Sequence, residues 1–293
     1  MGLSKRAYLK DLYLLTKPGI SRMQLITVSI GYILGGIAVF SGSVYGALLL
    51  GTFLIASGAG VLNSYYERDV DAKMERTQLR PLPDQRVNAK FAFCFGVFLS
   101  ILGGFLLYLY VNLITAFLAV VTVALYVYVY TPLKKVTWLN TFVGSFPGAM
   151  PILGGWAAAT GTLHLEAWIL FLILFTWQHP HFYALAIMYK EDYARGGLKM
   201  LPVVEPDLKR TNRQIIIYTL LMIMCSVIPF LLRLSGMIYL IGMLIFGGVM
   251  LYYSLELSKD KTISAARKLF FSSIIYLPLW FLLILIDFYF RLK

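Results

Sequence analysis

The stretch ALLLGTFLIASGAGVLNSYYERDVDAK, residues Ala47 to Lys73, decides the fold class of this chain. Its first part is an apolar run with the length and composition of a membrane span, and its last part is dense in Asp, Glu and Arg. Charged side chains at the edge of hydrocarbon are costly, and where they occur they usually serve a function. We therefore expect a membrane helix whose polar end carries a site.

The composition of all 293 residues agrees with a membrane protein. Hydrophobic residues make up 59% of the chain and charged residues 14%, against about 25% charged in ordinary soluble domains, and the mean hydropathy is +0.76. Apolar segments of roughly 20 residues, enough to cross a bilayer as a helix, recur along the sequence. We expect an all-α integral membrane protein, a single domain over residues 1–293 with nine transmembrane helices in one bundle. The spans are expected near residues 23–41, 44–62, 90–110, 113–131, 141–160, 166–187, 214–232, 236–256 and 270–289.

The basic residues predict the orientation, because cytoplasmic loops carry an excess of Lys and Arg. With a cytoplasmic N-terminus and the C-terminus outside, 23 of the 26 Lys and Arg residues fall on the cytoplasmic side. Anionic inner-leaflet lipids attract such loops, so the net charge of +12 does not require nucleic acid as a partner. The N-terminal segment lacks the short apolar core of a signal peptide. The sequence also shows no long presequence, so we expect a bacterial plasma membrane with the charged loops on the cytoplasmic side; the alternative is an organellar chain that has already been processed.

Acidic residues concentrate in two of the same loops, although a loop that only fixes topology gains little from acids. Nine of the 14 Asp and Glu residues follow the second and sixth predicted spans, namely Glu67, Asp69, Asp71, Glu75, Asp84, Glu191, Asp192, Glu205 and Asp207. Each cluster also contains basic residues and lies at the end of a span. The two clusters therefore predict one shared polar site.

The spacing within the first cluster indicates a metal site. Asn63, Glu67 and Asp71 follow one another at i, i+4 and i+8, so a helix that continues past the span places all three on one face. Two carboxylates and an amide offer only oxygen ligands, which suit Mg²⁺ with water and phosphate oxygens in its remaining positions. The alternative is a helix end that frays into the headgroup region, with its charges merely solvated.

The basic residues beside these acids predict a phosphate site. Arg76 and Arg80 follow directly in ERTQLRPLP, and guanidinium groups bind phosphate through paired hydrogen bonds. The stretches YKEDYARGGLKMLP and YTPLKK add Glu191, Asp192, Arg195, Lys199, Lys134 and Lys135 on the same side of the membrane. Acids that hold Mg²⁺ beside cations that hold phosphate together predict a diphosphate site.

These motifs resemble a known family. The pattern N-x₃-[D/E]-x₃-D followed by R-T-x₂-R-P-L, read here as Asn63, Glu67, Asp71, Arg76, Thr77, Arg80, Pro81 and Leu82, is similar to the intramembrane UbiA-type prenyltransferase superfamily. The stretches YTPLKKVTWLNTFVGSFPGAMPILGGWAAATG and WQHPHFYALAIMYKEDYARGGLKMLPVV resemble its haem O synthase branch, the protohaem IX farnesyltransferases. The resemblance runs from about Lys17 to Asp287.

The resemblance implies an activity. This is the Mg²⁺-dependent transfer of a farnesyl group from farnesyl diphosphate to the vinyl group of haem B, with addition of water, giving haem O for terminal oxidase assembly. It also implies surrounding membrane lipid and a haem A synthase or oxidase-assembly protein as a partner. Many members have Asp where this chain has Glu67, and related quinone-pathway enzymes are richer in aspartate around the position of Asp192.

The resemblance also assigns roles to residues. Metal ligands would be Asn63, Glu67, Asp71, Asp192 and Glu191. The diphosphate would be bound by Arg76, Arg80, Lys134, Lys135, Arg195 and Lys199. The catalytic set would be Asn63, Glu67, Asp71, Arg76, Lys135, Asp192 and Lys199. Aromatic faces can steady an allylic cation, and the candidates are Tyr65, Tyr66, Tyr126, Tyr130 and Phe182, each of which packing or interface anchoring would also explain.

Two histidines separate the haem branch from its relatives. His179 and His181 lie in TWQHPHFYALA, within the sixth predicted span. Imidazole is a common axial ligand of haem iron, so we expect a haem-related role, for His181 before His179. The alternative is a hydrogen bond between helices beside Pro180, whose ring frees a backbone carbonyl.

Three rival functions remain open on the sequence. An aromatic prenyltransferase of quinone synthesis, acting on a hydroxybenzoate or naphthoate, would share the diphosphate site but would not need WQHPH. A secondary transporter of an anionic metabolite would place its polar site near the membrane midplane, whereas these charges cluster at one face. A structural subunit of a respiratory complex would have little use for so many acids.

Overall fold

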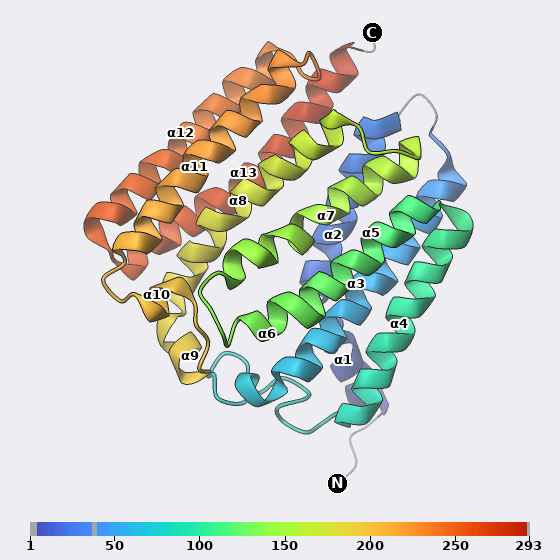
Figure 1. The fold of residues 1–293 in the computed structure, drawn as a ribbon, viewed down its shortest axis with the longest axis vertical. Coiled ribbons are helices and arrows are strands. Elements are labelled where there is room, and N and C mark those ends of the chain that lie inside the picture. Colours follow the sequence, from blue (N-terminus) through green and yellow to red (C-terminus); the bar gives the residue numbers. More distant parts are fainter. Residues whose placement is uncertain (1–4, 37–39, 292–293) are drawn as a thin grey trace. The chain divides into compact units, whose positions relative to one another are not determined.

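Every element in the described part of the chain is a helix (Figure 1). The computed structural model describes residues 5–36 and 40–291, and this part of the chain confirms the predicted all-α fold. Contacts divide the chain into two compact units. Unit 1 comprises Met1–Leu163 with Asp192–Leu198, and unit 2 comprises His164–Glu191 with Lys199–Lys293. The single domain over residues 1–293 stays a prediction.

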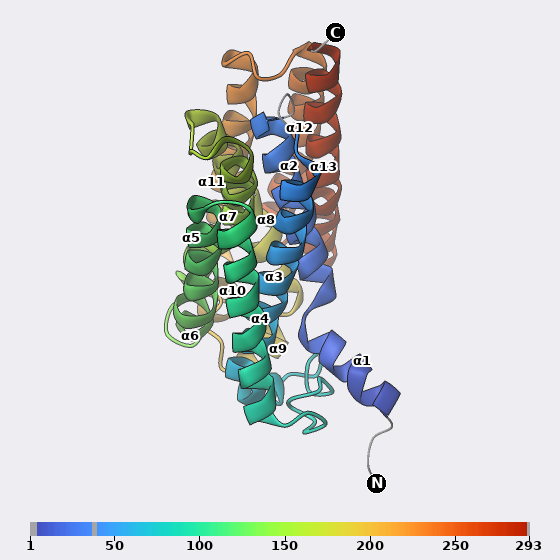
Figure 2. The same cartoon turned by 90° about the vertical axis from the view of Figure 1, so that its right-hand side faces the viewer.

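Unit 1 holds the helices that carry the first motif. They are α1 (Lys5–Leu15), α2 (Pro18–Gly36), α3 (Gly42–Asp71), α4 (Ala89–Tyr110), α5 (Leu113–Ala124) and α7 (Asn140–Thr160). Helix α5 continues through a π-helical turn, η2 (Leu125–Tyr130), into the short α6 (Thr131–Leu133). The short α1 lies at the same end of unit 1 as the loop between α3 and α4 (Figures 1 and 2), and ion pairing of Arg86 with Asp11 at 2.9 Å joins the two.

Unit 2 holds the helices that carry the histidines. They are α8 (Leu165–Met188), α10 (Leu201–Val204), α11 (Lys209–Leu231), α12 (Met237–Asp260) and α13 (Ile263–Arg291). The short α9 (Lys190–Arg195) runs across the boundary between the units. At the start of α12, the Asp287 carboxylate of α13 accepts hydrogen bonds from the backbone N–H groups of Gly236 at 2.6 Å and Tyr239 at 2.9 Å. This carboxylate satisfies two N–H groups that a helix start otherwise leaves without partners.

Small residues set the packing of unit 1, as is usual where helix backbones approach closely in membranes. A Cβ atom built on Gly58 of α3 would lie 2.6 Å from the carbonyl oxygen of Gly96 in α4. One built on Gly103 would lie 2.7 Å from the carbonyl oxygen of Gly51. On the other side of the unit, a Cβ atom on Gly155 of α7 would clash with the backbone of α2. These contacts require glycine because real Cβ atoms do not come so close to backbone atoms.

The predicted spans correspond to helices, with a difference at several ends. Helices occupy nearly all described residues of the nine predicted segments; the exceptions are residues 40, 41, 232 and 236, and residues 37–39 of the first segment lie outside the described part. The second segment is predicted to end near residue 62, whereas α3 continues to Asp71. Similarly, α11 and α13 begin several residues before the predicted starts near 214 and 270. Helices outlast their apolar stretches because charged residues such as Glu, Lys and Arg are good helix formers.

Seven of the described helices are long and apolar enough to cross a membrane. These are Gly42–Asp71, Ala89–Tyr110, Leu113–Leu133, Leu165–Met188, Lys209–Leu231, Met237–Asp260 and Ile263–Asp287. The remaining two helices at predicted spans, α2 and α7, are not among them. Helix α7 contains Pro147 and Pro151 together with many small residues, which lower its hydropathy. A membrane protein with seven such helices is thus supported, and the count of nine stays a prediction.

Candidate functional site

The end of α3 brings the first motif together as the spacing predicts. The helix runs unbroken to Asp71, which disagrees with the alternative of a frayed end. Asn63 and Asp71 are each 1% exposed and Glu67 is 8% exposed. The two carboxylates are therefore buried as well as aligned, and buried carboxylates need partners.

A different cation contacts each of these three side chains. The Lys17 ammonium donates to Oδ1 of Asn63. The Lys134 ammonium donates to Oε1 of Glu67 at 2.7 Å. The Arg80 guanidinium donates to Oδ2 of Asp71 at 2.9 Å. The motif is thus surrounded by three positive charges, which is the arrangement that a bound diphosphate would need.

Lys17 is a part of this site that sequence reasoning missed. It occupies the turn between α1 and α2 with φ of 51°, and Gly60 of α3 lets this turn approach, since a Cβ there would lie 2.9 Å from the carbonyl oxygen of Thr16. Burial lowers the pKa of Lys17 to about 8, although the Glu67 carboxylate opposes this shift. In the sequence, Lys17 is only one of several basic residues before a span, so no local signal separates it from those that set orientation.

Asn63 is also held from the side of η2. Its Nδ2 donates to Oγ1 of Thr131 at 2.8 Å, and that hydroxyl donates to the carbonyl oxygen of Tyr126 at 2.8 Å. In a π-helical turn, backbone hydrogen bonds join residues five positions apart instead of four. Because Nδ2 of Asn63 donates to Thr131, the Oδ1 atom of the same amide faces Lys17. Thr131, too, was missed by sequence reasoning.

Lys134 lies between an acid and an aromatic ring. Its ammonium is 2.7 Å from the Glu67 carboxylate and 4.4 Å from the centroid of the Tyr130 ring. Burial disfavours the charged amine, but the Glu67 carboxylate together with Tyr130 and Tyr126 outweighs burial and raises the pKa of Lys134 well above its ordinary value. Lys134 therefore stays positively charged. Tyr130 also stacks on Tyr126 with ring centroids 5.7 Å apart, so two of the aromatic candidates lie beside this cation.

Within unit 1, Asp192 of the second acidic cluster contacts the loop that follows α3. Asp192 accepts hydrogen bonds from the backbone N–H groups of Glu75 at 2.9 Å and Arg76 at 3.3 Å. It is also paired with the Arg195 guanidinium at 2.7 Å, and Arg195 contacts the Glu75 carboxylate at 3.2 Å. The hydrogen bond from Arg195 lowers the pKa of Asp192, although burial opposes it. Gly196 allows the close approach, because a Cβ there would lie 3.0 Å from Cγ1 of Val70.

The other residues predicted to bind metal or diphosphate do not share the buried face of α3. Among the described residues, no group of three or more His, Cys, Asp or Glu is arranged to hold a metal ion, so Asp192 does not complete such a group with the acids of α3. Arg76, Lys135, Glu191 and Lys199 are exposed, and Glu191 and Lys199 belong to unit 2. Their roles as metal or diphosphate ligands stay predictions.

The donor set at the end of α3 fits Mg²⁺. Two buried carboxylates and one amide oxygen are hard oxygen ligands on a single face. Mg²⁺ is usually held by one or two carboxylates and completes its octahedron with waters and phosphate oxygens.

The two histidines of α8 have different environments in unit 2. The Nδ1 atom of His179 is 2.8 Å from the carbonyl oxygen of Phe175, and its ring stacks on Tyr218 with centroids 3.6 Å apart. This histidine is 0% exposed. His181 is half-buried, and its Nδ1 atom is 2.8 Å from the hydroxyl of Ser273. Of the two, only His181 keeps some exposed surface, and its contact with Ser273 is a hydrogen bond between helices near Pro180, the stated alternative to a haem-related role.

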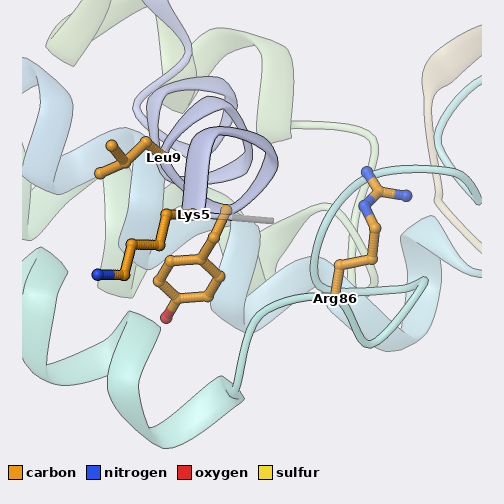
Figure 3. Close-up of a pocket in the computed structure, with 4 residues that line it drawn as sticks. Lys5, Leu9 and Arg86 are labelled. Carbon is orange, nitrogen blue, oxygen red and sulfur yellow. The ribbon is translucent and has the colours of Figure 1, made fainter. Parts of the chain in front are cut away.

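A surface pocket of about 470 Å³ lies elsewhere in unit 1 (Figure 3). Lys5, Tyr8 and Leu9 of α1 line it together with Arg86 of the loop before α4. None of the residues predicted for the metal, diphosphate or haem sites lines this pocket.

The chain is similar to known sequences over nearly its whole length. The UbiA prenyltransferase family matches residues 24–282 of the chain. A protein named Protoheme IX farnesyltransferase from Solibacter usitatus (strain Ellin6076) is 47% identical over 288 residues, which cover 95% of this chain and 99% of the relative. Another of that name, from Roseiflexus castenholzii, is 43% identical over 286 residues, covering 97% of this chain but 53% of the relative, so the chain spans about half of that protein.

Solved structures share the fold. A structure of digeranylgeranylglyceryl phosphate synthase aligns with a TM-score of 0.81 at 20% identity, covering 96% of this chain and 98% of that one. A UbiA homologue from Archaeoglobus fulgidus, bound to GPP and Mg²⁺, aligns with a TM-score of 0.68 at 15% identity, covering 94% and 99% of the two chains. The helical architecture, the family match and the sequence relatives agree. The chain belongs to the UbiA prenyltransferase family.

Proposed function

We propose that this protein transfers the farnesyl group of farnesyl diphosphate to a vinyl group of haem B, with addition of water, to form haem O. The observation that carries the proposal is the buried face of Asn63, Glu67 and Asp71, which is ringed by three cations. Relatives named protoheme IX farnesyltransferase, 36–47% identical over nearly the whole chain, support haem as the acceptor.

The cations prepare the site for the leaving group. Without ligand, Lys17, Lys134 and Arg80 neutralise the motif. A metal-bound diphosphate would instead contact both the three cations and the oxygens of the motif. Its oxygens would accept hydrogen bonds from the cations, and its metal would accept the oxygens of Glu67 and Asp71. Fixed charges placed where negative charge develops are a large term in catalysis. Residues that stand ready in this way need little rearrangement as the C–O bond breaks.

The acids at the end of α3 supply the metal ligands. We propose that Asn63, Glu67 and Asp71 hold Mg²⁺. An Archaeoglobus fulgidus homologue that shares the fold has been solved with GPP and Mg²⁺ bound. When bound, Mg²⁺ supplies positive charge to the diphosphate oxygens as the leaving group forms. Asp192 and Arg195 hold the loop after α3 in place, and we propose the same acid, with Glu191, as the source of further metal ligands.

In the remaining steps, bonds break and form only between atoms of the substrates and water. As the allylic C–O bond breaks, its electron pair leaves with the diphosphate. The haem vinyl group then bonds to the allylic carbon, and water adds to the resulting cation with loss of a proton. The aromatic rings of Tyr126 and Tyr130 beside Lys134 offer negative faces to a carbocation. We propose His181 as the haem contact, since His179 is enclosed.

The membrane setting follows the charge pattern. We propose nine spans, including α2 and α7, in a bacterial plasma membrane with a cytoplasmic N-terminus, an external C-terminus and the diphosphate site facing the cytoplasm. A haem A synthase or an oxidase-assembly protein is proposed as the partner that receives the product.

A product assay tests this function. Purified protein in detergent is given Mg²⁺, farnesyl diphosphate and haem B, and the extracted haem is measured by mass spectrometry. We expect a gain of one farnesyl group and one water that is lost on chelation of Mg²⁺. Asp71→Asn and Glu67→Gln should reduce turnover at least about 100-fold, because each removes a charge at the metal.

A neighbouring acid provides the control. Asp69 lies on another side of α3 with its side chain 76% exposed, so Asp69→Asn should keep near wild-type activity. Full activity of folded Asp71→Asn protein would contradict the metal site. Prenylation of an added hydroxybenzoate or naphthoate in place of haem would instead reject haem as the acceptor.

A further inference from the structure

Ser273 of α13 contacts the histidine that the proposed function assigns to haem. The Ser273 hydroxyl is 2.8 Å from Nδ1 of His181, although 92 positions separate the two in the sequence. Ser273 itself is 0% exposed, and its hydroxyl also lies 2.6 Å from the carbonyl oxygen of Phe270. The hydroxyl therefore has two partners in unit 2, and it has only one proton to share between them.

Counting protons decides which partner donates. The Phe270 carbonyl can only accept, so the Ser273 proton goes to it. The Ser273 oxygen must then accept from His181, which requires the proton of the neutral imidazole to lie on Nδ1. The opposite arrangement would leave two oxygen lone pairs facing each other at 2.6 Å. The other ring nitrogen, Nε2, consequently carries the lone pair.

The surroundings of His181 fix the ring orientation as well. Its ring stacks on Trp177 with centroids 4.9 Å apart and on Phe270 with centroids 4.8 Å apart. The indole N–H of Trp177 donates to the carbonyl oxygen of Ser273 at 2.9 Å, which ties α8 to α13 at the same place. Among the described residues Nε2 of His181 has no hydrogen-bond partner. A lone pair held in a fixed direction with no protein partner is the arrangement of a ligand nitrogen.

We propose that Ser273 is a positioning residue that holds His181 in the Nδ1–H tautomer and so directs Nε2 toward haem iron. The inference rests on the proposed function, because it requires haem to be the substrate that His181 meets. Hydrogen-bond partners of this kind orient metal-ligating histidines and raise their basicity, and their loss typically costs about 10–100-fold in metal affinity. Ser273 does not itself touch the substrate.

The chain offers a matched control one position away. Ser272 makes the same kind of helix contact, with its hydroxyl donating to the carbonyl oxygen of Leu269 at 2.8 Å, but it does not contact His181. Wild type, Ser273→Ala, Ser272→Ala and His181→Ala are titrated with ferric haem B in detergent. The readouts are the position of the Soret band, the Kd for haem and, separately, the Kd for farnesyl diphosphate with Mg²⁺.

We expect His181→Ala to shift the Soret band and Ser273→Ala to weaken haem binding about tenfold or more. Ser272→Ala should match wild type, and all variants should bind farnesyl diphosphate equally. Haem binding by Ser273→Ala that equals that of Ser272→Ala would overturn the role of Ser273 while leaving the haem site intact. Identical spectra for wild type and His181→Ala would overturn the ligation and the role of Ser273 together, whereas the reaction itself is judged independently by the product assay.

Discussion

The cations that contact the α3 motif have a physical reason to be there. Glu67 and Asp71 are nearly fully buried, and an isolated buried carboxylate is unfavourable by several kcal/mol. Lys134 and Arg80 remove this penalty with contacts at 2.7 and 2.9 Å. Removing one partner of such a pair usually destabilises a protein by about 3–5 kcal/mol. The cations that pair with these carboxylates in the protein without ligand are therefore the ones that would pair with a metal-bound diphosphate instead.

Lys17 allows this exchange to be tested at a single residue. The substitution Lys17→Met removes a charge beside Asn63, and we expect the Kd for farnesyl diphosphate with Mg²⁺ to rise roughly tenfold or more, since a hydrogen bond to a charged group is worth about 1.5–3 kcal/mol. Titration calorimetry or ligand-induced change in Tm measures this. Lys10→Met, which removes an exposed lysine of α1, is the control and should behave as wild type. Equal affinities for the two variants would exclude Lys17 from the site.

At the scale of one element, the length of α3 explains the position of the motif. Its 30 residues span about 45 Å, whereas the hydrocarbon core is about 30 Å thick. The final turns, which carry Glu67 and Asp71, can therefore extend to the membrane edge while the apolar part stays in lipid. A farnesyl diphosphate molecule has the same division, with a charged head and an apolar tail.

Close packing of α2 against α7 predicts that replacing Gly155 by alanine destabilises the protein, whereas replacing the adjacent Gly154 does not. A Cβ atom on Gly155 would meet the backbone nitrogen of Tyr32 at 2.8 Å and clash with the carbonyl of Val28, whereas one on Gly154 would have no atom within 4 Å. Gly155→Ala should therefore lower the free energy of unfolding by about 1–3 kcal/mol. Gly154→Ala should leave it unchanged or raise it by up to about 1 kcal/mol, because alanine favours helix.

Thermal unfolding in detergent distinguishes the two variants. A lower Tm for Gly155→Ala alone is expected, and equal Tm values would mean that α2 and α7 do not pack as closely as the structure has them. Because α2 begins directly after Lys17, a loosened α2 should also weaken farnesyl diphosphate binding in Gly155→Ala.

For the whole molecule, the orientation can be tested with two introduced cysteines. The loop after α3 and the turn after α7 lie at opposite ends of unit 1 (Figures 1 and 2). In a background without Cys94 and Cys225, the free cysteines of the described chain, Gln78→Cys should react with a membrane-impermeant maleimide only after cells are opened. Thr162→Cys should react in intact cells. The reverse pattern would overturn the proposed cytoplasmic N-terminus.

The sequence by itself determined the helices and the alignment of the first motif. Both depend on local periods, since a run of about 20 apolar residues specifies a span and a step of four residues specifies one helix face. Asn63, Glu67 and Asp71 could therefore be placed together by their spacing alone, and Arg80 could be placed near them by its position in the motif. The ends of the helices were less predictable because charged residues continue a helix without changing its apolar pattern.

Only the tertiary structure decided which partners these residues have. Lys17 lies 46 positions from Asn63, Asp192 lies 117 positions from Glu75, and Ser273 lies 92 positions from His181. Such pairs share no period or motif, because contacts between distant segments arise only when helices pack and their glycines and turns allow approach. The sequence of α3 thus places the proposed metal ligands on one face. Their charged partners, and the hydroxyl group beside His181, reach their positions only through the packing of distant segments.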